Sequence, residues 1–176
     1  MANFTERLLR AAKLDASLYE EVETDQGALG QATMAVVLSS VAAAIGSSAH
    51  QLSIGGWIVG AIVTLLAWFV WAYLTYLIGT KILAEPTTQA DWGQLLRTTG
   101  FSSAPGLIRV LGIIPGLTGV VFAIASIWML VAMVVAVRQA LDYKSTLRAV
   151  GVCVIGWVIQ ALILLLFFGL AERPLA

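Results

Sequence analysis

The sequence predicts an all-α integral membrane protein: a helix bundle with five transmembrane helices and short amphipathic interfacial helices. Three observations predict this fold class. First, 60% of the 176 residues are hydrophobic and only 11% are charged, against roughly 25% charged in soluble domains. Second, the chain holds five apolar stretches, most of them near the roughly twenty residues that a crossing helix needs. Third, the basic residues between these stretches fall almost entirely on one side, which indicates a cytoplasmic amino terminus.

The amino-terminal segment, residues 1–31, is expected to be cytoplasmic and amphipathic. Phe4 and Leu8 share one helical face, and Leu18 and Val22 share another, as the i, i+4 spacing requires. The segment is acidic and lacks an early apolar core, so it does not read as a cleavable signal peptide. Two interpretations stay open: short helices lying along the membrane interface, and a solvated helical tail.

Residues 32–170 are expected to form the membrane domain, with the first two spans at about 32–49 and 57–79. Small residues spaced four apart let neighbouring helix backbones approach closely. Such residues are Ser39, Ala43 and Ser47 in the first span, and Gly56 and Gly60 at the start of the second. We therefore expect close helix contacts along both spans.

The third span, at about 100–117, is the weakest because it is short and contains Pro105 and Arg109. The loop before it holds Asp91, which is expected to start an interfacial helix. If the third segment crosses, eight basic residues lie inside and one outside, with Arg109 in the membrane. If it forms a re-entrant loop, the count becomes seven against three. The positive-inside rule therefore favours five crossings.

The fourth and fifth spans are predicted at about 119–137 and 149–170, followed by a short extracytoplasmic tail, 171–176. Gly112 and Gly116, just before the fourth span, have the spacing of a helix-contact motif. Five spans place the amino terminus in the cytoplasm and the carboxyl terminus outside.

Four stretches carry a resemblance to a known family: YLTYLIGTKIL, DWGQLLRTTGFSSAPGLIRVLGIIPG, WMLVAMVVAVRQALDY and RAVGVCVIGWVIQ. With the acidic amino terminus and five spans, they resemble bacterial members of the YIP family (Ypt/Rab-interacting-protein domain) over about residues 3–170. The resemblance implies a small non-enzymatic protein, here of the inner (plasma) membrane. Eukaryotic members associate with prenylated Rab-type GTPases. Their DLYGP-like motif is not in this sequence, so we expect the fold, and not that role, to carry over.

The residue patterns of a membrane enzyme are missing from the sequence. It contains no HExxH or GxSxG motif, and its ten acidic residues fall outside the predicted spans. One cysteine leaves no intramolecular disulfide, and there is no Cys/His cluster for a metal. We therefore expect no catalytic residue, cofactor or metal. Zero net charge gives no sign of a nucleic-acid partner.

Arg109 is the most unusual residue, because a charge within a span usually faces the bundle interior or a water-filled cavity. With Pro105 and Gln160 it forms a candidate contact for a lipid or a partner. The alternatives are that Arg109 snorkels to the outer interface, and that Gln160 only hydrogen-bonds between helices.

Asp142 and Tyr143, in the loop after the fourth span, are a candidate docking point for a partner protein. Alternatively, Asp142 pairs with Arg138 at a helix end, and Ser145 or Thr146 then caps the fifth span.

Two functions remain. The first is a membrane adaptor, scaffold or accessory subunit that packs against other membrane proteins. The second is a lipid- or small-solute-handling protein, transporter or channel-like, with a polar cavity around Arg109. The glycine motifs and the small-residue first span also suit self-association into a homo-oligomer.

Overall fold

The computed structural model describes residues 3–47 and 54–171, and this part of the chain is helical without strands. Four helices in it are long and apolar enough to cross a membrane: Ala28–Gly46, Gly55–Ile82, Thr118–Ala140 and Thr146–Ile163. The predicted all-α class is therefore confirmed. The last two residues of the first predicted span, and almost all of the predicted tail, lie outside the described residues.

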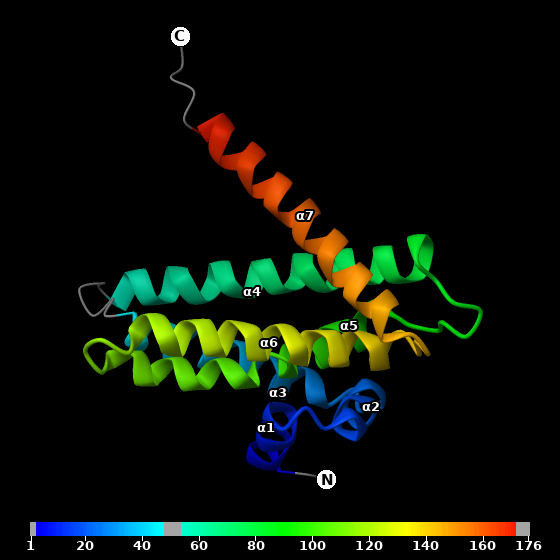
Figure 1. The fold of residues 1–176 in the computed structure, drawn as a ribbon, viewed down its shortest axis with the longest axis horizontal. Coiled ribbons are helices and arrows are strands. Elements are labelled where there is room, and N and C mark those ends of the chain that lie inside the picture. Colours follow the sequence, from blue (N-terminus) through cyan, green and yellow to red (C-terminus); the bar gives the residue numbers. More distant parts are fainter. Residues whose placement is uncertain (1–2, 48–53, 172–176) are drawn as a thin grey trace.

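Two short helices, α1 (Phe4–Ala12) and α2 (Ala16–Thr24), form a helical cap on the side of the bundle. Figure 1 shows both of them against the longer helices, away from the carboxyl end of the chain. Leu18, Tyr19 and Val22, on α2, are fully buried. The amphipathic segment therefore folds as two packed helices and not as a solvated tail.

The long elements follow as α3 (Ala28–Gly46), α4 (Ile54–Leu77) with its π-helical continuation η2 (Ile78–Ile82), α6 (Thr118–Ala140) and α7 (Thr146–Ala171). Figure 1 shows α3, α4 and α6 running lengthwise along the bundle. Helix α7 contacts α4, η2 and α6 near its start and diverges from them toward its carboxyl end. The bundle is thus open along one side of α7.

The third predicted span is built differently from a short α-helix. It comprises the end of α5 (Trp92–Phe101), a 3₁₀-helix, η3 (Ala104–Ile113), and the turn that follows. Asp91 starts α5 with a capping box, as the sequence predicted for an interfacial helix. Pro105, which has no backbone N–H, lies in the first turn of η3. Five crossing helices are therefore not confirmed: four long helices and this composite segment are observed.

Glycines bring α3 and η3 into backbone contact. A Cβ atom on Gly46 would lie 1.7 Å from the carbonyl oxygen of Arg109. One on Gly112 would lie 2.7 Å from the carbonyl oxygen of Gly46, and one on Gly106 would lie 2.1 Å from Oγ of Ser39. No side chain fits at these three positions, so the glycines determine how closely η3 lies on α3.

Replacing Gly46 should therefore disrupt the bundle, whereas replacing Gly60 should not. Gly60 lies in an apolar helix too, but has no atom within 4 Å of its Cβ position. We expect Gly46→Val to destabilise the protein by about 3 kcal/mol, because the added side chain forces the two backbones apart. Apparent melting temperatures in detergent measure this. Equal melting temperatures for Gly46→Val and Gly60→Val would contradict the assigned contact.

Candidate functional site

A buried arginine holds the helical cap together. The side chain of Arg7 is 3% exposed. Its guanidinium donates to Glu21 at 2.9 Å, to Asp25 at 2.7 Å and to Gln31 at 3.0 Å. These partners belong to α2, to the connection after it and to α3. A buried charge is tolerated when it is paired in this way, so Arg7 locks three successive segments to one another.

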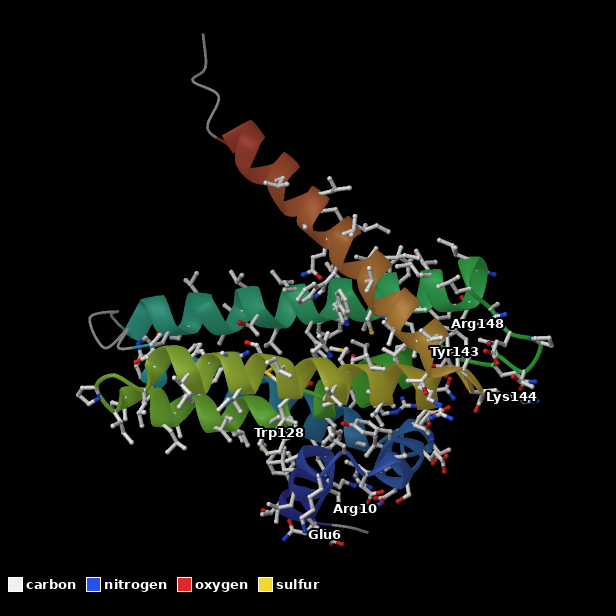
Figure 2. The ribbon with its side chains drawn as sticks, in the orientation of Figure 1. Glu6, Arg10, Trp128, Tyr143, Lys144 and Arg148 are labelled. Carbon is white, nitrogen blue, oxygen red and sulfur yellow. The ribbon has the colours of Figure 1, made fainter. Side chains whose placement is uncertain are left out.

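Polar contacts from the membrane helices hold the cap against the bundle. Nε of Arg97, on α5, donates to the carbonyl of Val22 at 2.9 Å, and its Nη2 donates to that of Glu23. These carbonyls lie at the negative end of the α2 dipole. Nε1 of Trp128, midway along α6, donates to the carbonyl of Ala12 at 2.8 Å. Figure 2 shows Trp128 directed at the cap.

Glu23 is the cap residue whose charge is least favoured. It is 9% exposed. Burial and the nearby negative charges of Asp142, Glu20 and Asp91 raise its pKa from 4.5 to about 7, against the opposing effect of Arg97. The ionisation of Glu23 therefore falls near neutral pH.

We expect Glu23 to make the protein less stable as pH rises. Between pH 4.5 and about 7 the folded state binds more protons than the unfolded state, so the free energy of unfolding falls through this window. Glu23→Gln should remove that dependence and raise the apparent melting temperature at pH 8 by roughly 5 °C. Glu6→Gln, at an exposed position of α1, is the control. An unchanged pH profile in Glu23→Gln would contradict the burial of an unfavourable charge.

Tyr143 holds the loop after α6 against the end of η2. Its side chain is 4% exposed, and its hydroxyl lies 2.8 Å from the carbonyl oxygen of Gly79 and 2.9 Å from that of Leu83. Burial raises the pKa of this phenol to about 12, so it stays protonated and able to donate. Figure 2 shows Tyr143, Lys144 and Arg148 gathered at this end of the bundle.

The predicted ion pair between Arg138 and Asp142 is not formed. Asp142 has a φ of +52° and is exposed, because the chain turns out of the helix there. Arg138 donates instead to the carbonyl of Tyr143 at 3.2 Å. An ion pair between Arg148, in the first turn of α7, and Glu85, in the loop after η2, joins these two segments; Nε of Arg148 lies 3.4 Å from Oε1 of Glu85.

Removing the Tyr143 hydroxyl should weaken this loop contact. We expect Tyr143→Phe to lower the free energy of unfolding by about 1–3 kcal/mol, because buried carbonyls lose a donor. Tyr73→Phe is the matched control, since Tyr73 is 47% exposed. Thermal unfolding of both variants distinguishes them; a Tyr143→Phe protein as stable as Tyr73→Phe would show that the hydroxyl makes no useful bond.

A central cavity of about 360 Å³ lies between α4, α6 and α7, with α5 and η3 along its floor. Most of its lining is apolar and includes Trp68, Trp71 and Trp157. Two of these indoles are satisfied within the wall: Nε1 of Trp68 donates to Thr99 at 3.2 Å, and Nε1 of Trp71 contacts the Met133 sulfur at 3.3 Å. The cavity therefore combines a tryptophan-lined wall with a few polar groups.

Arg109 and Gln160 both line this cavity. Nε of Arg109 is buried without a hydrogen-bond partner, and its guanidinium carbon lies 5.6 Å from the ring centre of Phe122. Within the described residues neither side chain forms an ion pair or a side-chain hydrogen bond. Two of the three residues that the sequence grouped as one candidate contact therefore line the same cavity.

The other predicted residues lie elsewhere. Pro105 is buried in η3 and is not part of the cavity wall. Asp142 and Tyr143 lie at the loop end of the bundle. Of the predicted packing residues, Ser39 and Gly112 lie in the contact between α3 and η3, while Gly116 lies in a turn and has a φ of +84°. A Cβ atom on Gly60 would meet no neighbouring atom, and Gly56 lies at the start of α4. Ala43 is half-buried and Ser47 is exposed.

Sequence reasoning missed the residues that hold the cap. Arg7, Arg97 and Trp128 were counted only as charges or span residues. A signal for Arg7 exists in the sequence, because its acidic partners follow it at positions 21 and 25. Nothing comparable marks Arg97 or Trp128, because their acceptors are backbone carbonyls far away in the chain.

The family model of the Yip1 domain matches residues 16–168. The chain belongs to the Yip1 family. The match begins at the start of α2 and runs through nearly all of α7, so it includes the central cavity and leaves out α1. No curated protein and no solved structure matches this chain. Family membership and the apolar helices together make it a Yip1-family membrane protein.

Proposed function

We propose that this Yip1-family protein is a non-enzymatic membrane adaptor, which presents its helical cap to a partner protein. The observation that carries the proposal is the fixed position of the cap. Arg7 joins its helices to α3, while Arg97 and Trp128 tie it to α5 and α6. A surface held in one conformation binds a partner at a lower entropic cost than a loose tail does.

The proposal includes five crossings, with the amino terminus inside and the carboxyl terminus outside. Helix α5 has 10 residues and η3 has 10. At rises of about 1.5 and 2.0 Å per residue, the two span about 15 and 20 Å. Together they exceed a hydrocarbon core of about 30 Å, so η3 and the end of α5 are long enough for the proposed crossing. The 3₁₀ geometry thus gives the short third segment the length to cross, and the positive-inside rule sets the orientation.

The exposed side of α1 is the docking surface that we propose on the cap. Leu9 is 58% exposed there. Glu6 and Lys13, three residues before it and four after, are exposed on the same side. An exposed leucine between two opposite charges suits a protein partner with an apolar contact and a polar rim.

The test is purification in a gentle detergent at native expression, with the bound proteins identified by mass spectrometry. We expect one stoichiometric partner. Leu9→Arg should lose it by altering the surface, and Arg7→Gln should lose it by releasing the cap. Leu147→Arg is the matched control, because Leu147 is 81% exposed on α7. A wild-type protein without a stoichiometric partner, or a partner retained by Leu9→Arg, would refute this surface.

The second expected function, lipid or solute handling, is favoured by one specific observation. The central cavity holds Arg109 and Gln160 together. It involves none of the cap residues, so this function and the adaptor role are compatible.

A further inference from the structure

The central cavity contains a cation without a counter-charge. Among the described lining residues none is Asp or Glu. The face of Phe122 attracts the guanidinium of Arg109 but accepts only weakly from its N–H groups. An unpaired charge in an apolar environment is costly, and such residues mark binding sites in membrane proteins. The missing negative charge is therefore best supplied by a bound molecule.

Two further polar groups face the same space. Gln160, on α7, has two amide donors, and Ser126, on α6, has an exposed hydroxyl. The hydroxyls of Ser102 and Ser103 are already used, because they donate to the carbonyls of Thr99 and Gly100 at 2.6 Å each. The free donors thus come from η3, α6 and α7. Several N–H and O–H donors around one cation suit a phosphate group.

An apolar groove continues from the central cavity. This α6–α7 groove has a volume of about 320 Å³. It is lined by Leu130, Val131, Val134, Val150, Cys153, Val154 and Trp157. Three of these residues, Leu130, Cys153 and Trp157, also line the central cavity. A polar site and an apolar groove therefore share a wall, which is the arrangement that an amphiphile requires.

We propose that the cavity and groove together bind one anionic phospholipid. Its phosphate accepts from Arg109 and Gln160, and one acyl chain lies in the α6–α7 groove. Arg109 lies four residues before the end of η3, or about 8 Å at the rise of a 3₁₀-helix. The valines of the groove lie toward the loop between α6 and α7. In the proposed topology the headgroup therefore faces outward and the chain inward, as in an outer-leaflet lipid. The site is independent of the adaptor role.

Native mass spectrometry of the full-length protein in detergent tests this site. The probes are dioleoyl phosphatidylglycerol and dioleoyl phosphatidylcholine, which share acyl chains and differ in net charge. We expect one equivalent of phosphatidylglycerol to bind at least tenfold more tightly than phosphatidylcholine. Arg109→Gln should abolish this preference. Lys81→Gln is the control, because it removes one exposed charge outside the cavity.

Further variants separate the parts of the site. Gln160→Leu should reduce the preference for phosphatidylglycerol over phosphatidylcholine about threefold. If the Arg109→Gln variant does not fold, Gln160→Leu still tests the headgroup contact. Val131→Trp fills the groove and should weaken both lipids. Equal binding of the two lipids by the wild type, or an unchanged preference in both headgroup variants, would overturn the proposal. Displacement of the lipid by an equimolar amount of soluble glycerol phosphate would overturn its acyl-chain part.

Discussion

The close approach of α3 and η3 is the contact on which the membrane bundle depends. It exists because Gly46 and Gly112 leave no Cβ atom between the two backbones, and Gly106 leaves room for the side chain of Ser39. This contact holds the third segment in an extended 3₁₀ form that α3 and α6 support on either side. It also fixes the backbone of Arg109, whose carbonyl lies against Gly46. The position of the cation in the central cavity is thus a consequence of glycine packing.

Charge is handled in opposite ways in the two parts of the molecule. In the cap, the buried guanidinium of Arg7 is met by two carboxylates and an amide, so its charge stabilises one arrangement of helices. In the membrane bundle, Arg109 has only the ring of Phe122 nearby. A guanidinium that is fully paired within the protein suits a structural role, and one that is incompletely paired suits a binding site for an anion. The protein thus has a fixed helical cap and an open cavity at different places.

The splayed position of α7 connects these features to the bilayer. Its first turns are held by the loop contacts of Tyr143, Arg148 and Glu85. Beyond them it diverges from the bundle (Figure 1), which leaves apolar residues such as Trp157, 64% exposed, facing outward. A helix anchored at one end and open along the other lets a lipid chain enter from the side. The polar loops therefore help to define the opening of the cavity.

The sequence by itself determined the all-α membrane class and the Yip1 resemblance, and it singled out Arg109 and Gln160 as candidates, because hydropathy and an isolated polar group in an apolar span can be recognised locally. It also predicted the helix that starts at Asp91. Only the tertiary structure decided that the third segment is partly a 3₁₀-helix, that Arg138 does not pair with Asp142, and that Arg7, Arg97 and Trp128 fasten the cap. These features depend on contacts such as that between Trp128 and Ala12, which are 116 residues apart. No local pattern encodes the contacts of Arg97 and Trp128, since each acceptor is a backbone carbonyl placed by the packing of other helices.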